Sequence, residues 1–349
     1  MGDYLLVVGL LLLCGALFTW AFRVLPQDGW QILAVVPKKK NEGDTWTGLN
    51  FTYYGVFVAT AVTVAVTMML TLLAAIRIPP KEGLLLVGLA LVGSVPFARL
   101  MARLVEGKKH TFTIAGASFV GLLIMPVGLM GFNALLQGKD HFIPLMPSLA
   151  ALGVAYALGE GLGRLACISF GCCYGKPVNQ CGPFVQRLFR GRGFVFWGKT
   201  KKIAYESALE GSEVVPVQAM SSVVLVGVSL GAMVAFLLGK FGVSFLISVL
   251  GAQLWRLISE GLRADYRGEG RFSWYQVMSL VAMVYAVILV LLVPPALLDP
   301  PDALRGFASL WEPTILFSLQ ALWLTIFLYT GRSAVTGAIL SFHVFRDKV

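Results

Sequence analysis

The sequence predicts an all-α polytopic membrane protein, and two observations carry that prediction. Of its 349 residues, 57% are hydrophobic and only 13% are charged, whereas a soluble domain carries about 25% charged residues. Long apolar runs also recur along the chain, and each can cross roughly 30 Å of hydrocarbon as a helix. This pattern excludes a soluble globule, a disordered tail, a coiled coil and an ordinary nucleic-acid-binding protein, so no nucleic-acid partner is expected.

Nine apolar runs are predicted to be spanning helices, because backbone polar groups find no water partner inside a bilayer. They are Tyr4–Phe22, Phe51–Ile76, Leu84–Val105, Thr113–Leu136, Phe142–Phe170, Pro216–Leu238, Val243–Leu262, Trp274–Val293 and Ala308–Tyr329. A signal peptide is the alternative for the first run, but that run has no basic start and no clear small-residue cleavage site. We interpret it as a retained helix.

The formal charge of +10 is concentrated in polar connections. Segment 27–50 contains Lys38-Lys39-Lys40, and segment 171–215 is a long polar excursion. Its basic residues are Lys176, Arg187, Arg190, Arg192, Lys199, Lys201 and Lys202, and they alternate with Phe184, Phe189, Phe194, Phe196 and Trp197. This mixture favours a segment lying on anionic lipid headgroups, and an ordinary solvated loop is the alternative.

Three groups of charges fall inside predicted spans, where a central Arg costs roughly 2.5–3.5 kcal/mol on insertion scales. One of them, Arg99 with Arg103, is expected only to reach toward the membrane interface. Glu160 and Arg164 are four residues apart and share a helix face, so they can pair. Glycines at 159, 161 and 163 allow another backbone or a lipid to approach that helix closely. A buried ion pair that only fixes helix register is the alternative for this group.

The second group predicts an anion site. Arg256, Glu260 and Arg263 are spaced to form one stripe of a helix. Together with the first group they give three arginines against two carboxylates, and an uncompensated buried cation costs several kcal/mol. A bound anion removes that cost, and in a membrane the abundant anion is a phospholipid phosphate, which the guanidinium fork binds well.

These motifs resemble those of the prolipoprotein diacylglyceryl transferase family. The family's first motif is matched by Gly163-Arg164 and by Gly175, while Cys167 and Cys172 stand where the family has Asn and Glu. Its second motif is matched throughout, by Arg256, Glu260, Arg263, Asp265 and Ser273-Trp274-Tyr275-Gln276. Tyr54-Gly55 and Pro216-Val217-Gln218 match two shorter motifs.

The resemblance implies a seven-helix core over residues 51–294, including the excursion 171–215. Residues 1–50 would then add an N-terminal helix and a basic loop, and residues 295–349 a further hydrophobic segment and a tail. A family His-Gly-Gly segment should fall near 115–117, where no histidine occurs; the histidines are His110, His141 and His343. The lipid-binding frame is therefore kept while part of the catalytic set is changed.

By resemblance, the reaction moves a diacylglyceryl or glyceryl group from an anionic glycerophospholipid, such as phosphatidylglycerol, to a thiol or another acceptor. Arg164 and Arg256 would stabilise the phosphate leaving group, Glu260 would orient the arginines or act as base, and Tyr54 would donate a hydrogen bond to the phosphate. Cys172 is a candidate nucleophile. The expected substrate-binding residues are Glu160, Cys167, Gly175, Gln218, Arg263, Asp265 and Gln276. No cofactor is expected.

The cysteine cluster leaves several interpretations open. A disulfide of Cys173 with Cys181 or Cys172 is favoured if this face is extracytoplasmic. Zinc is disfavoured because the spacing has no C-x-x-C pair and no histidine accompanies it, so no metal is expected. Cys167 can also be a packing residue. Two rival functions follow, a non-catalytic lipid-binding protein on the same frame and a membrane thiol–disulfide protein.

The expected location is the bacterial cytoplasmic membrane, with several spans and the active site on the extracytoplasmic face. That orientation follows from the resemblance and puts most Lys and Arg residues outside, which inverts the positive-inside rule. We keep it because the basic face is also the proposed headgroup-binding face. Phospholipid is the expected donor partner, and the acceptor is left as a protein thiol, a lipid or a small molecule.

Overall fold

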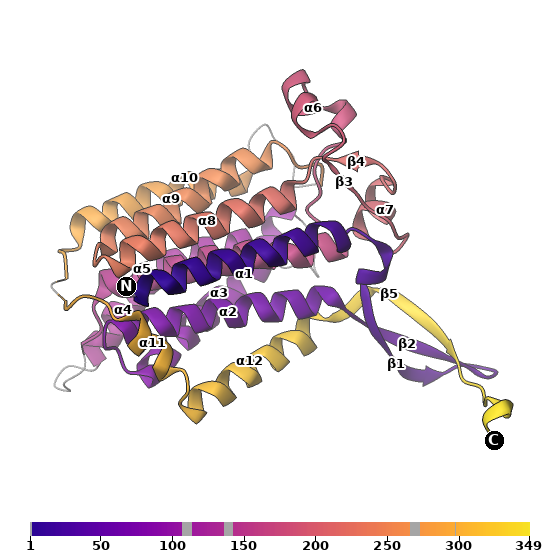
Figure 1. Ribbon diagram of the computed structural model, residues 1–349, viewed down its shortest axis with the longest axis horizontal. Coiled ribbons are helices and arrows are strands. Elements are labelled where there is room, and N and C mark those ends of the chain that lie inside the picture. Colours follow the sequence, from indigo (N-terminus) through magenta and orange to yellow (C-terminus); the bar gives the residue numbers. More distant parts are fainter. Residues whose placement is uncertain (1, 107–113, 136–141, 266–272, 297) are drawn as a thin grey trace.

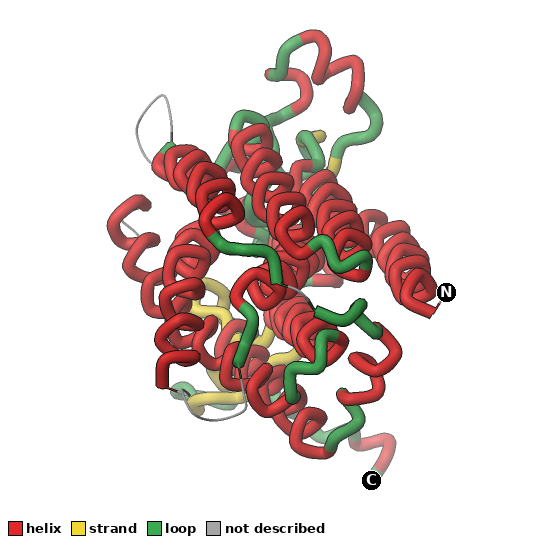
Figure 2. Tube along the Cα trace, turned by 90° about the vertical axis from the view of Figure 1, so that its left-hand side faces the viewer, coloured by secondary structure: helices red, strands yellow, loops and turns green. Residues whose placement is uncertain are grey.

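A computed structural model of the chain describes residues 2–106, 114–135, 142–265, 273–296 and 298–349. Within them, eight helices are long and apolar enough to cross a membrane, which confirms the all-α polytopic class. These are α1 (Gly2–Val24), α2 (Tyr53–Ala75), α4 (Ile114–Leu135), α5 (Leu145–Phe170), α8 (Val217–Leu237), α9 (Phe241–Glu260), α10 (Trp274–Leu292) and α12 (Pro313–Thr330). The remaining predicted run lies within α3 (Pro80–Glu106). The helices run alongside one another as one bundle (Figures 1 and 2).

Helix α5 is the centre of the bundle, packed against α2, α8 and α9. Its small residues permit that packing, because a Cβ on Gly159 would lie 2.8 Å from Ala65 Cβ and one on Gly161 would lie 3.1 Å from the Val226 backbone nitrogen. Neighbouring backbones therefore approach α5 as closely as the glycine spacing predicted. Because α5 is enclosed, any charged residue on it must find its partners inside the protein.

Both terminal segments join in one antiparallel sheet at the end of the bundle where α1 finishes (Figure 1). Its strands, in spatial order, are β1 (Ile32–Lys40), β2 (Thr45–Thr52) and β5 (Arg332–Ser341). The sequence predicted only a basic loop and a tail in these places. Thr52 fixes the junction with the bundle, since its hydroxyl donates to the Gly331 carbonyl at 3.1 Å. Gly55 allows the start of α2 to lie directly against Gly331, because a Cβ on Gly55 would meet Gly331 Cα.

The polar excursion folds over the same end of the bundle (Figure 1). It contains η2 (Val178–Gln180), α6 (Pro183–Phe189), the hairpin of β3 (Phe194–Val195) with β4 (Glu213–Val214), and α7 (Lys202–Ser207). Its aromatic residues divide, because Phe194 and Phe196 are buried while Phe184 and Trp197 are exposed. Only the exposed rings are available to a membrane surface, and contact with headgroups stays a prediction.

A buried lysine ties the excursion to the first helix. Lys201 Nζ donates to the Leu25 carbonyl at 3.1 Å and to the Ser169 carbonyl at 2.7 Å. The short η1 (Asp28–Trp30) follows α1 here, and the Trp30 carbonyl accepts a hydrogen bond from the Ser169 hydroxyl. The end of α1, the end of α5 and the excursion are thus fixed to one another.

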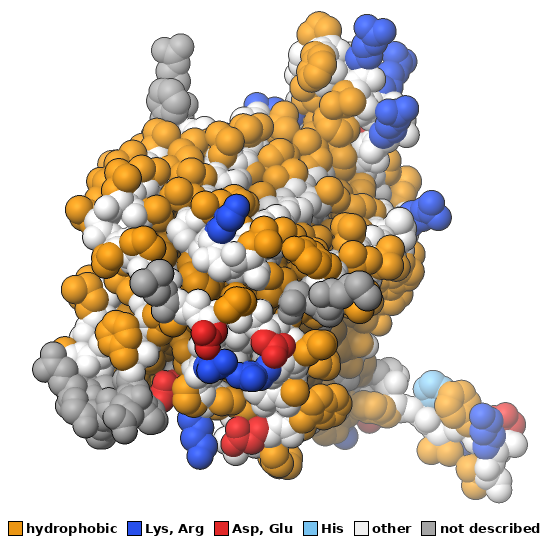
Figure 3. Space-filling model, turned by 60° about the vertical axis from the view of Figure 1, so that its left-hand side comes forward, with side chains coloured by type: hydrophobic (Ala, Val, Ile, Leu, Met, Phe, Trp, Pro, Cys, Tyr) orange, Lys and Arg blue, Asp and Glu red, His pale blue; other side chains and the backbone are white. Residues whose placement is uncertain are grey.

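The opposite end of the bundle carries α11 (Ala303–Ser309) and exposed ion pairs. Arg77 and Asp299 lie 3.0 Å apart, and Arg305 and Asp302 lie 3.9 Å apart. Figure 3 shows hydrophobic side chains over most of the visible surface, interrupted by a small group of acidic and basic ones. The last element, η3 (Arg346–Lys348), lies beyond the sheet. Apolar flanks between polar ends suit a membrane-spanning bundle.

Candidate active site

The site begins with a polar stripe on α5. Tyr156, Glu160, Arg164 and Cys167 are spaced by three or four residues, so their side chains share one face of the helix. Glu160 Oε1 accepts a hydrogen bond from Arg164 Nη2 at 2.5 Å, as the spacing predicted. Only 3% of the Glu160 side chain and 14% of the Arg164 side chain are exposed. The pair is therefore held away from bulk solvent.

Arg256 reaches the same carboxylate from α9. Its Nη2 donates to both Glu160 oxygens at 2.7 Å and to the Tyr156 hydroxyl at 3.0 Å. Its Nη1 donates to the Ser118 hydroxyl of α4 at 3.2 Å. Side chains from α4, α5 and α9 therefore form one hydrogen-bond network, which holds the Arg256 guanidinium and the Glu160 carboxylate in one orientation.

Around Glu160, the positive charges exceed the negative charges by one. Two guanidinium groups share a single carboxylate, and Arg164 Nε is buried without a hydrogen-bond partner. A buried donor without a partner costs about 1–3 kcal/mol, and more when it is charged. The site is thus short of one anionic acceptor.

The predicted stripe of Arg256, Glu260 and Arg263 is corrected by the structure. Helix α9 ends at Glu260, so Arg263 lies beyond it and does not share the stripe. Its Nε and Nη2 each donate to an Asp265 carboxylate oxygen at 2.8 Å. Both Glu260 and Asp265 interact electrostatically with Arg263. Arg263 thus has two carboxylates nearby, and the positive excess is local to Arg164 and Arg256, which share Glu160.

The segments that carry the two motifs are joined through their backbones. Gly175 pairs with Arg263 as an isolated bridge, and Ala264 N donates to the Tyr174 carbonyl at 3.1 Å. Gly175 permits the contact, because a Cβ there would lie 2.3 Å from the Val215 carbonyl oxygen. The first motif, the second motif and the start of α8 consequently meet at one place.

Three further predicted residues lie around this junction. The Tyr54 ring contacts Phe170 with centroids 5.6 Å apart, and its hydroxyl interacts electrostatically with Arg164. Gln218 Nε2 donates to the Cys172 carbonyl at 2.9 Å. Gln276 completes a capping box with Ser273 at the start of α10, and its Nε2 donates to the Leu257 carbonyl at 3.5 Å. Both glutamines donate to backbone carbonyls, and Gln218 Oε1 is buried without a hydrogen-bond partner.

The cysteines separate into a cluster and an outlier. The Sγ atoms of Cys167, Cys172 and Cys173 all lie within 4.8 Å of one another. Cys181 stands apart, with its thiol donating to the Pro177 carbonyl at 3.4 Å. None of the five cysteines, all of which lie among the described residues, forms a disulfide, so the predicted disulfide of Cys173 is not formed. Hydrogen bonds within the cluster, followed by burial, raise the pKa of the Cys172 thiol well above its usual value.

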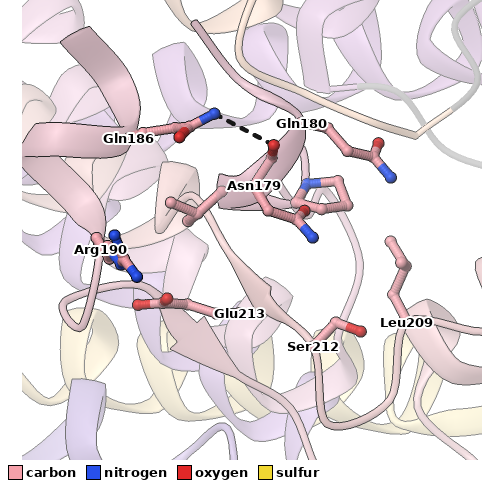
Figure 4. A pocket seen from close by; sticks show the side chains of 9 residues that line it. Asn179, Gln180, Gln186, Arg190, Leu209, Ser212 and Glu213 are labelled. Carbon is pink, nitrogen blue, oxygen red and sulfur yellow. Dashed lines mark hydrogen bonds between the residues drawn. The ribbon is translucent and has the colours of Figure 1, made fainter. Parts of the chain in front are cut away.

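A separate cavity of about 510 Å³ lies in the polar excursion, where Gln186 donates to the Asn179 carbonyl at 3.2 Å (Figure 4). Arg190 and Glu213 also line it. Its lining residues differ from those of the charged cluster. We therefore treat it as a feature of the excursion and not as the reaction site.

Two functional neighbours were missed from the sequence. Tyr156 lies four residues before Glu160, a spacing that places it on the same face, while Ser118 gave no signal because only the fold brings α4 to Arg256. Of the histidines, His110 and His141 lie outside the described residues, and His343 is exposed beyond β5. The structure therefore assigns no histidine to the site among the residues it describes.

The fold and site together define a multi-pass membrane protein with a buried, positively charged site between two helices. The family model of the prolipoprotein diacylglyceryl transferases matches residues 45–292. The chain belongs to this transferase family, and the match covers every predicted site residue. A search of curated proteins finds no match to the chain.

Proposed function

We propose that the protein binds an anionic glycerophospholipid, such as phosphatidylglycerol, between α5 and α9 and transfers its diacylglyceryl or glyceryl group to an acceptor. The observation that carries this proposal is the surplus charge: Arg164 and Arg256 share one carboxylate, and Arg164 Nε is buried without an acceptor. A lipid phosphate supplies the missing negative charge. The guanidinium fork matches phosphate oxygens in geometry.

The proposed reaction is a substitution at the glycerol carbon that bears the phosphate. An acceptor thiolate attacks that carbon, the carbon–oxygen bond breaks, and its electron pair leaves with the phosphate monoester. Arg164 and Arg256 stabilise the charge that grows on the leaving oxygen. Glu160 holds both arginines in place, Tyr54 donates a hydrogen bond to the phosphate, and Glu260, which interacts with Arg263, orients that arginine or takes the acceptor proton.

The other predicted substrate-binding residues are proposed to position the site. Gln218 holds the Cys172 carbonyl, Gln276 the Leu257 carbonyl, and Asp265 the guanidinium of Arg263. Gly175 lets the two motifs meet. We propose that this junction lies on the extracytoplasmic face of a bacterial inner membrane, where the basic excursion meets the headgroups. The acceptor is a protein thiol or, since Cys167 and Cys172 replace family residues, another lipid or a small polar molecule.

The test uses the full-length protein in nanodiscs that contain phosphatidylglycerol labelled in its terminal glycerol, with a thiol peptide as acceptor. Release of labelled glycerol phosphate, together with a diacylglyceryl thioether on the peptide, supports the proposal. Arg164→Gln should abolish release, while Arg77→Gln at the opposite end should leave it unchanged. Stoichiometric lipid retention without turnover under any acceptor would contradict it and favour the non-catalytic lipid-binding function.

A membrane thiol–disulfide function is the second candidate, favoured by the three clustered thiols. It predicts that replacing Cys172, Cys173 and Cys181 together by Ser abolishes activity, whereas Arg164→Ala and Arg256→Ala matter less. Activity that is lost with the arginines and kept without the cysteines eliminates this candidate.

A further inference from the structure

The end of α5 folds back so that three cysteines converge. Gly171 ends the helix in the left-handed region at φ +70°, and the Cys172 amide donates to the Cys167 carbonyl at 3.0 Å. The turn brings Cys172 and Cys173 to the thiol of Cys167, with all three Sγ atoms within 4.8 Å of one another. The spacing of the cysteines in the sequence disfavoured a metal site, because spacing does not show that the chain turns back after Gly171.

Backbone strain marks the third cysteine. Cys173 has φ +58°, a left-handed conformation that is unfavourable for a residue with a side chain and that glycine adopts freely. Glycines are abundant in this part of the chain, yet a cysteine occupies the strained position. Gln218 further fixes the turn through the Cys172 carbonyl. The turn thus holds a thiol where the backbone alone would favour glycine.

Cations surround the thiols. Cys173 interacts electrostatically with both Arg164 and Arg263, and Cys172 with Lys202. Nearby cations favour thiolates, and three thiolates around a divalent ion carry a net charge of −1. Zinc binding would release the thiol protons, and the neighbouring cations lie where they attract the resulting thiolates.

The dimensions also suit zinc. A zinc–sulfur bond is about 2.3 Å long, which places tetrahedral sulfur ligands roughly 3.7 Å apart. The three Sγ atoms lie within 4.8 Å of one another, close to that separation. Sulfur ligands favour zinc over magnesium or calcium. Three protein ligands with one open position are typical of catalytic zinc, whereas structural sites are closed by four.

We propose that Cys167, Cys172 and Cys173 bind one zinc ion whose open fourth position takes the acceptor thiol of the transfer reaction. This inference rests on the proposed function. On binding zinc, the acceptor thiol loses its proton to solvent and becomes a thiolate. Its sulfur forms a bond to the glycerol carbon, the carbon–oxygen bond breaks, and the electron pair leaves with the phosphate monoester. The neutral thioether is a weaker ligand than a thiolate and leaves the metal.

This assignment also accounts for the chemistry of Cys172. If its own thiolate attacked the lipid, the product would be a thioether on the enzyme, which has no leaving group for a second transfer. Cys172 as nucleophile therefore gives one self-modification, whereas Cys172 as ligand permits turnover. The two roles give different products and can be distinguished by mass.

The experiment measures zinc in the full-length protein, purified in detergent under reducing conditions, stripped with a chelator and reloaded with zinc. We expect one zinc per chain, and cobalt loading should give the charge-transfer bands of a cobalt–thiolate centre. Cys173→Ser and Cys172→Ser should each lower the affinity at least tenfold, with helical content unchanged. Cys181→Ser, outside the cluster, should bind zinc like the parent protein.

The proposal would be overturned by reduced thiols without zinc binding, by equal zinc binding in Cys173→Ser and the parent, by a disulfide within the cluster, or by a diacylglyceryl adduct on Cys172. Transfer activity that survives complete zinc removal would also overturn it while leaving the proposed transferase function intact. Bound zinc without release of glycerol phosphate would instead contradict the transferase function and the acceptor role, and leave only the metal site.

Discussion

Two sets of ion pairs at opposite ends of the molecule use the same chemistry in different surroundings. Arg77 and Asp299 lie 3.0 Å apart with side chains 63% and 68% exposed, whereas Arg256 and Glu160 lie 2.7 Å apart with side chains 11% and 3% exposed. The exposed pair is balanced one to one and screened by water. The buried set has two arginines to one carboxylate and little screening. The difference indicates that the exposed pair is a surface feature and the buried set a site that needs a ligand.

The largest effect is expected from removing the Glu160 carboxylate, which Arg164 and Arg256 share. Glu160→Gln leaves two buried guanidinium groups without a charged partner, so we expect a loss of about 3–5 kcal/mol in the free energy of unfolding. Asp299→Asn should cost less than about 1 kcal/mol. Loss of helicity during titration with a denaturing detergent measures both. Equal losses in the two variants would show that burial does not distinguish the pairs.

The second prediction concerns geometry rather than charge. Arg256→Lys keeps the charge but cannot hold Glu160, Tyr156 and Ser118 at once. One hydrogen bond to a charged group contributes about 1.5–3 kcal/mol, so we expect roughly a 10- to 100-fold fall in glycerol phosphate release. Arg77→Lys is the matched exposed control and should keep full activity. An Arg256→Lys enzyme as fast as the parent would remove Arg256 from the catalytic set.

A third prediction extends the comparison to a buried cation outside the membrane spans. Burial lowers the pKa of Lys201 from 10.5 to about 8, while Asp28 acts in the opposite direction. Between these values the unfolded chain binds the extra proton, so the free energy of unfolding should rise as the pH increases from about 8 to 10.5. Lys201→Met should remove that rise. A pH profile identical in the parent and the variant would contradict the shift.

The smallest effect is expected at the exposed pair. Arg77→Ala should change the free energy of unfolding by about 0–1 kcal/mol, and that difference should shrink as salt is added. Thermal or detergent unfolding at two ionic strengths measures it. A large loss in the free energy of unfolding that does not depend on salt would show that Arg77 stabilises the protein by more than a surface ion pair.

The sequence was informative where the signal is local. Apolar runs predicted the helices, and the spacing of Glu160 and Arg164 predicted their pair. Sequence reasoning failed where a contact depends on the residue at which a helix ends or on segments far apart in the chain. Helix α9 stops before Arg263, so a stripe drawn through that residue was wrong.

Contacts between distant segments account for the other gaps. β5 pairs with β2 across almost the whole chain, and neither strand has the clean alternation of polar and apolar residues that predicts a strand. The contact of Arg256 with Glu160 joins residues 96 positions apart. The thiol cluster needed the left-handed turn at Gly171 and Cys173, and no motif spacing reports a turn of that kind.

The headgroup of an anionic phospholipid should complete the coordination of Arg164 and Arg256. Native mass spectrometry of the full-length protein with equal amounts of phosphatidylglycerol and phosphatidylcholine, whose headgroup has no net charge, tests it most directly. We expect one retained phosphatidylglycerol per chain, lost in Arg164→Gln and kept in Arg77→Gln. Equal retention of both lipids, or undiminished phosphatidylglycerol on Arg164→Gln, would contradict it.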